Sequence, residues 1–253
     1  MTNKKTNNPW IGLINSSELE SDQTPTIFCF PHSGGGSSIY SGWKNSCPPG
    51  IKICSVVLPG RDGRLEEPLY SDMDNLISDL LPAVSPYFNR PYVFFGHSFG
   101  SFVAFALTKA LLSEGYQNPQ HLFVSASRAP HIGEQEPLVH LMSDSDLTAA
   151  LSALDGLPTA FLSSPELLKL FLPVIRADLS ISETYLTKQE RIPISITAFG
   201  SEEDPRVSVQ NLRLWEEMTS EEFNCGMFSG GHFYLKHHET HIVERVATLI
   251  KQS

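Results

Sequence analysis

Residues 92–106 of this chain read YVFFGHSFGSFVAFA. An apolar run leads into Gly96-His97-Ser98-Phe99-Gly100, and an apolar segment compatible with a helix follows. The pattern predicts a strand, a sharp turn and a helix, with the serine on the turn. Such a turn requires glycine two residues before and after the serine, because a side chain there would collide with the strand or the helix. Unpaired N–H groups at the helix N-terminus favour negative charge, so Ser98 is a candidate nucleophile.

Five further short apolar runs recur along the chain, and most are separated by segments of helix length. With the first they occupy residues 27–30, 53–58, 92–95, 122–126, 194–199 and 225–228. Their hydrophobicity is mostly continuous rather than alternating, which is typical of strands buried on both faces of a parallel sheet. The sequence therefore predicts an α/β fold with a mostly parallel central sheet flanked by helices.

The connection between the runs at 122–126 and 194–199 is far longer than one crossover helix needs. Residues 141–154 and 165–186 have helical patterns, and 167–175 are apolar nearly all round, which requires cover on several sides or an apolar cavity. We predict a helical lid over residues 133–188, inserted into a single domain whose core is 26–132 and 189–253 and whose N-terminal arm is 1–25. An ordinary extra layer of core helices is the alternative.

A serine hydroxyl needs a general base, and the base needs an acid that orients it. In the order typical of α/β-hydrolases, the acid follows a late strand and the histidine follows the last strand. Asp204 follows the run 194–199 and His232 follows the run 225–228, so we predict that they are the partners of Ser98. Glu202 and Glu203 are alternatives to Asp204.

An oxyanion hole needs two backbone N–H groups. Phe99, directly after the nucleophile, is one predicted donor. The second is Ser33, in the loop PHSGGG at residues 31–36, where glycines let the main chain approach a ligand closely. A flexible turn is the alternative interpretation of this triple glycine.

Composition narrows the classes of partner. A net charge of -10 over 253 residues, without a cluster of Lys and Arg, argues against nucleic-acid binding.

The N-terminus lacks the pattern of a signal peptide, and the four cysteines form no C-x-x-C pair, so we expect a cytoplasmic protein with free thiols. His237 and His241 have the spacing of metal ligands but lack a third, and we expect neither a metal nor another cofactor.

Five blocks of the sequence match the motifs of one family in order and spacing: residues 30–35 (FPHSGG), 58–68 (LPGRDGRLEEP), 95–100 (FGHSFG), 172–185 (LPVIRADLSISETY) and 230–235 (GGHFYL). They resemble the stand-alone type II thioesterases of nonribosomal peptide and polyketide synthases. Two positions depart from that family, which commonly has Met where this chain has Phe99 and Ala where it has Ser33.

The resemblance implies an α/β-hydrolase fold and a triad of Ser98, Asp204 and His232, with the N–H groups of Ser33 and Phe99 as the oxyanion hole. It implies hydrolysis of acyl thioesters on the phosphopantetheine arms of carrier proteins, which clears stalled or misloaded chains. Two alternatives are a general serine esterase or acyltransferase on small acyl esters, and a non-catalytic module that binds a synthase.

Carrier domains are typically acidic, as is this chain, so we expect a local basic rim for docking. Arg61, Arg64 and Arg128 follow strand ends and are candidates for it; a structural role as ion-pair partners is equally open. We expect a monomer that binds neither membrane nor nucleic acid.

Overall fold

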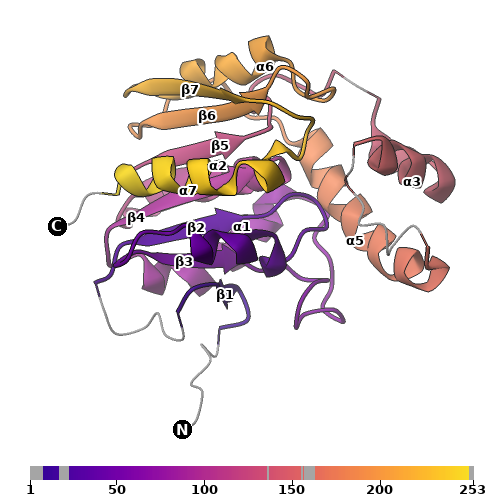
Figure 1. Ribbon diagram of the computed structural model, residues 1–253, viewed down its shortest axis with the longest axis horizontal. Coiled ribbons are helices and arrows are strands. Elements are labelled where there is room, and N and C mark those ends of the chain that lie inside the picture. The colour runs from indigo at the N-terminus through magenta and orange to yellow at the C-terminus, as the bar shows by residue number, and fades with distance from the viewer. Residues whose placement is uncertain (1–7, 17–22, 136, 155, 157–162, 251–253) are drawn as a thin grey trace, which may run out of the picture.

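The computed structural model describes residues 8–16, 23–135, 137–154, 156 and 163–250, and its centre is a sheet of seven strands (Figure 1). The strand order is β1-β3-β2-β4-β5-β6-β7. Their bounds are β1 Ile11–Leu13, β2 Thr26–Phe30, β3 Lys52–Val56, β4 Tyr92–His97, β5 Leu122–Ser125, β6 Ile196–Ser201 and β7 Phe223–Phe228. All neighbours are parallel except β1, which runs antiparallel to β3 at the edge. The predicted mostly parallel sheet is confirmed.

Both faces of the sheet are buried. In β4, Tyr92 and Phe94 pack into one hydrophobic cluster, and Val93 and Phe95 pack into the other. The other inner strands alternate in the same way, which explains why their sequences are apolar without a polar face. Helices α1 (Met73–Val84) and α2 (Phe99–Glu114) contribute to the first cluster, while α7 (Glu239–Thr248) and the 3₁₀ helix Ser37–Asn45 contribute to the second.

The helix ends follow from local sequence. The side chains of Asp72, Ser143 and Ser164 accept hydrogen bonds from backbone N–H groups at the starts of α1, α3 (Asp144–Ala153) and α5 (Pro165–Thr184). Helix α2 ends at Gly115, whose φ of 72° suits glycine. The other helices in the described ranges are α6 (Val209–Arg213) and 3₁₀ segments at Ser85–Tyr87, Val139–Leu141, Leu214–Met218 and Tyr234–His237.

Helices α3 and α5 lie between β5 and β6 in the chain, beyond one side of the sheet (Figure 1). They share a small hydrophobic cluster built on Val139, Leu147 and Leu172. The predicted cover of 167–175 holds only for part of the segment: Leu172, Val174 and Ile175 are buried and Ile175 lines the cavity described below, whereas Leu170 is 50% exposed. The helix continues through Pro173, so this proline does not end it.

No helix in the described ranges is long and apolar enough to cross a membrane. The four cysteines are free thiols, and burial raises the pKa of Cys54 to about 12. At the N-terminal edge, β1 places part of the predicted arm in the sheet. Residues 1–7 and 17–22 of that arm lie outside the described residues.

Candidate active site

Ser98 is the single residue between β4 and α2, and its backbone has φ 54° and ψ −120°, a region that L residues rarely adopt. The turn is tight on both sides. A Cβ atom at Gly96 would lie 2.4 Å from the carbonyl oxygen of Gly100, and one at Gly100 would lie 2.0 Å from the carbonyl oxygen of Phe30. Only glycine fits at either position, as the sequence motif requires.

The structure brings the three residues of the predicted triad together. His232 Nε2 lies 3.0 Å from Ser98 Oγ, and His232 Nδ1 lies 2.9 Å from Asp204 Oδ2. The other carboxylate oxygen, Asp204 Oδ1, accepts a hydrogen bond from the backbone N–H of Arg206 at 2.8 Å. Asp204 and His232 are buried in the loops after β6 and β7, so the acid holds the imidazole with one nitrogen toward the serine.

The alternative acids are placed elsewhere. Glu202 and Glu203 are exposed, and Glu203 Oε1 accepts a hydrogen bond from the backbone N–H of Gly230 at 3.1 Å. Glu203 thereby stabilises the turn that precedes His232. Asp204 is the one of these three carboxylates that contacts the imidazole.

The two predicted oxyanion donors flank the nucleophile. Phe99 is the first residue of α2, and Ser33 lines the same cavity as Ser98. Within the described residues, neither backbone N–H donates a hydrogen bond to another protein group. The ring of Phe99 is fully buried in the core, away from the cavity lining, so its bulk does not narrow the cavity.

The glycine-rich loop is fastened to helix α5 by a carboxylate that the sequence analysis did not single out as functional. Asp178 Oδ2 accepts from the backbone N–H of Gly34 at 2.7 Å and from Arg61 Nη1 at 2.7 Å, while Asp178 Oδ1 accepts from Arg61 Nη2 at 2.9 Å. Both charged groups are buried. The sequence feature that could have identified Asp178 is an acidic residue among the apolar positions of a predicted helix.

The predicted docking role of three arginines is wrong, because all three are buried. Arg61 pairs with Asp178. Arg64 pairs with Glu67, and its guanidinium lies 3.9 Å from the ring centre of Trp10. Arg128 donates to the carbonyl oxygens of Ile132, Ser182 and Tyr185, the last two at the end of α5. These side chains hold loops in place, which was the alternative interpretation.

Two further histidines lie beside the triad. His97 Nδ1 is 2.8 Å from Ser125 Oγ, which is itself 2.5 Å from the hydroxyl of Tyr234. Burial lowers the pKa of His97 well below its usual range, and it is fully enclosed. Desolvation, with the nearby His232 as the next cause, lowers the pKa of His32 to about 3. His97 and His32 are therefore neutral near pH 7.

Ser98 and His232 line a cavity of about 530 Å³. Its walls include residues of α3 and α5, among them Leu151, Ile175 and Leu179. In the part of the chain that the structure describes, no group of three or more His, Cys, Asp and Glu side chains is arranged to hold a metal ion. The site offers a serine, a base, an orienting acid, N–H donors without a protein acceptor and a cavity for the substrate, a combination suited to acyl transfer.

Comparison with known proteins gives the family. A model of the thioesterase domain matches residues 25–250. Gramicidin S biosynthesis protein GrsT of Aneurinibacillus migulanus is 35% identical over 219 residues, covering 86% of each chain. Linear gramicidin dehydrogenase LgrE of Brevibacillus parabrevis is 34% identical over 224 residues, 87% of this chain and 85% of that protein.

A solved structure supports the same family assignment. The type II thioesterase BorB from the borrelidin biosynthetic cluster superposes with a TM-score of 0.82 at 31% identity, covering 96% of this chain and 97% of that one. The chain therefore belongs to the thioesterase family and is a type II thioesterase of the α/β-hydrolase fold.

Proposed function

We propose that this enzyme hydrolyses acyl thioesters on the phosphopantetheine arms of carrier proteins and so removes stalled or misloaded acyl groups from a nonribosomal peptide or polyketide assembly line. The observation that carries the proposal is the hydrogen-bonded series Ser98, His232 and Asp204, whose side chains line one cavity, in a chain of this family. The names of GrsT and BorB, which place those proteins in biosynthetic pathways, support the same role.

In the proposed mechanism, His232 Nε2 accepts the proton of the Ser98 hydroxyl as Oγ attacks the thioester carbon. Asp204 keeps the imidazole in the tautomer that presents Nε2, and its charge stabilises the imidazolium that forms. The N–H groups of Ser33 and Phe99 donate to the oxyanion. The pantetheine thiol leaves with a proton from His232, and water activated by the same imidazole hydrolyses the acyl-enzyme.

We assign residues 133–188 the role of a lid on a single domain whose core is 26–132 and 189–253; of these ranges, 136, 155, 157–162 and 251–253 lie outside the described residues. Helices α3 and α5 supply one wall of the cavity and share a small hydrophobic cluster of their own, while Ile181 of α5 packs into the first cluster of the sheet. Arg176 on α5 ties the start of α3, since it donates to the carbonyl oxygen of Met142 at 2.8 Å and to Asp144 at 2.6 Å. The two helices therefore form a unit that covers the acyl group.

The alternatives are weaker on these observations. A non-catalytic binding module has no need of a serine held at an unfavourable φ with a histidine 3.0 Å away. The name of LgrE suggests a dehydrogenase, but the turn after β2 reads HSGGGSSI and lacks the G-x-G-x-x-G pattern of dinucleotide binding. A general serine esterase or acyltransferase uses the same triad, so a substrate test must separate it from a thioesterase.

We further propose that the enzyme works as a cytoplasmic monomer without a metal or other cofactor. All proposed catalytic groups come from one chain, and hydrolysis by this mechanism requires only water. Analytical ultracentrifugation tests the monomer, and activity that survives EDTA tests the independence from metal.

The decisive experiment compares hydrolysis of acyl-carrier proteins, acyl-pantetheine thioesters and oxygen esters with the same acyl group. We expect the thioesters to have the higher kcat/KM, and carrier-bound thioesters the highest. Ser98→Ala should lower kcat by roughly 10⁴- to 10⁶-fold with folding intact, since alanine meets the same φ as serine. A loss below about tenfold would remove Ser98 as nucleophile, and faster turnover of oxygen esters would favour the esterase.

A further inference from the structure

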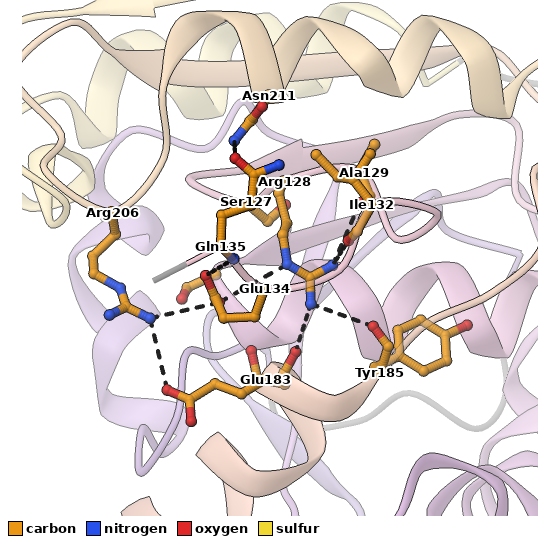
Figure 2. A network of polar contacts seen from close by, with 12 residues as sticks. Ser127, Arg128, Ala129, Ile132, Glu134, Gln135, Glu183, Tyr185, Arg206 and Asn211 are labelled. Carbon is orange, nitrogen blue, oxygen red and sulfur yellow. Dashed lines mark hydrogen bonds and ion pairs between the residues drawn. The ribbon is translucent and has the colours of Figure 1, made fainter. Parts of the chain in front are cut away.

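The cavity beside the triad has two unlike walls. One is apolar and comes largely from the lid, including Val139, Leu151 and Leu179. The other is polar and comes from the loops after β5 and β6 together with α5 and α6, and its arginine, glutamate and amide side chains are drawn in Figure 2. A cavity for a plain alkyl chain needs only the first wall, so the second requires an explanation.

Two of the charged side chains in the polar wall, Glu183 and Arg128, already form hydrogen bonds with other protein groups. Glu183 accepts from the backbone N–H groups of Val139 and His140, both at 3.2 Å, and lies 2.5 Å from the ring nitrogen Nδ1 of the same histidine. The Nη atoms of Arg128 donate to backbone carbonyl oxygens, as described above. These two residues fix the polar wall in place.

Arg206 is different. Among the described residues its guanidinium makes two ion pairs, in which Nη2 lies 3.6 Å from Glu134 Oε2 and 3.6 Å from Glu183 Oε1, both longer than a hydrogen bond (Figure 2). Over the described ranges, no hydrogen bond from this side chain to a protein group is found, and it is 21% exposed at the cavity. The ion pairs hold the guanidinium through Nη2, and the three N–H donors on Nε and Nη1 remain available to a ligand.

Two more donors of this wall are buried without a hydrogen-bond partner among the residues that the structure describes. They are the hydroxyl of Ser127 and the Nε–H of Arg128, whose residues are 3% and 6% exposed. The Nε atom has only the carboxylate of Glu134 at 3.9 Å. Buried donors are rarely left unpaired, because each costs free energy unless an acceptor meets it.

We infer that Arg206 and Ser127 select acyl groups that carry a neutral oxygen acceptor beyond the thioester, as the amide carbonyl of a peptidyl-type chain does, over alkyl chains of equal length. The inference rests on the proposed function. A neutral acceptor fits better than a carboxylate, because the charges of Arg128 and Arg206 already face those of Glu134 and Glu183. The acyl chain would lie between the two walls, with its carbonyl oxygen toward the guanidinium of Arg206.

The test uses three pantetheine thioesters matched in number of non-hydrogen atoms: an alkanoyl chain, an N-acylaminoacyl chain and a chain that ends in a carboxylate. Arg206→Met should lower the kcat/KM ratio of the amide chain to the alkanoyl chain by about 10- to 100-fold. Ser127→Ala, a smaller change, should lower it by roughly 2- to 10-fold and keeps the test decisive if the first variant misfolds. Arg213→Met, an exposed position of α6 outside the cavity lining, is the matched control and should leave the ratio unchanged.

The backbone N–H of Arg206 that donates to Asp204 is retained in the methionine variant, so the ratio reports on the side chain alone. Equal losses on both chains would make Arg206 a structural residue and overturn the inference, as would a preference of the wild type for the carboxylate or the alkanoyl chain. The proposed function survives these outcomes, because thioesters are still hydrolysed. Failure to hydrolyse any thioester would overturn both.

Discussion

Replacement of Asp178 by asparagine tests how far the lid helix supports the oxyanion loop. The carboxylate and Arg61 are both buried, so the neutral side chain leaves a guanidinium charge without its partner. Removing one member of a buried ion pair costs roughly 3–5 kcal/mol. We expect a decrease of that size in the free energy of unfolding, measured by urea denaturation. The matched control is Asp144→Asn, whose ion pair with Arg176 is exposed at the carboxylate and is worth roughly 0–1 kcal/mol.

The same variant should lower kcat more than it raises KM. Asp178 accepts from Gly34, the neighbour of Ser33, so a loosened loop misplaces one oxyanion donor. The loss should approach but not exceed the roughly 10²- to 10³-fold that removal of a whole donor causes. The double variant Arg61→Met with Asp178→Leu should recover much of the stability, because apolar pairs often replace buried ion pairs at little cost. If Asp178→Asn is no more damaging than Asp144→Asn on either measure, the reasoning fails.

Three further predictions concern the nucleophile turn, the acid stability and the lid. Gly100→Ala should destabilise the fold by about 3 kcal/mol or more in urea denaturation, because its Cβ would lie 2.0 Å from a carbonyl oxygen. Gly133→Ala is the control and should be nearly neutral, because no atom lies within 4 Å of the added Cβ. Similar values for the two variants would contradict the tight turn. Burial lowers the pKa of His121 to about 4, so the unfolded chain binds its proton first and this residue lowers stability by about 3 kcal/mol as pH drops from about 6.5 to 4. His32 and His97, whose pKa values are also lowered, add to the decline, so His121→Gln should reduce it rather than abolish it. An unchanged pH profile in that variant would refute the reasoning. In hydrogen exchange, α3 should exchange faster than β4 and slow when a non-hydrolysable acyl-pantetheine binds Ser98→Ala; equal protection without ligand would make the lid a fixed layer.

The sheet and the triad could be predicted from the sequence because their signals are local. The strands are apolar on both faces, and the nucleophile turn has steric demands that only Gly96 and Gly100 meet. The ends of elements were less certain: the run 53–58 continues two residues beyond the strand, which ends at Val56. Residues Val57 and Leu58 are buried by loop packing rather than by the sheet, and composition does not distinguish the two.

Long-range pairing was beyond the sequence. Arg61 and Arg64 follow the end of a strand, which suggested that their side chains reach solvent. Both side chains are instead buried beside a carboxylate: Arg61 pairs with Asp178 on a distant helix, and Arg64 pairs with Glu67 in the same loop. Arg206 carried no motif at all. Its place in the cavity follows from the turn that orients Asp204 and from two glutamates on other segments.

The backbone of Ser98 also bears on how such a chain evolves. A residue other than glycine at φ 54° and ψ −120° costs roughly 1–3 kcal/mol, which is a sizeable share of the stability of a typical domain. Glycine would adopt the same conformation without that cost and would remove the hydroxyl. Selection for stability alone would therefore favour glycine at position 98 and an inactive protein. Selection for catalytic turnover is what retains the serine. At Ser98, activity and stability are therefore opposed within a single residue.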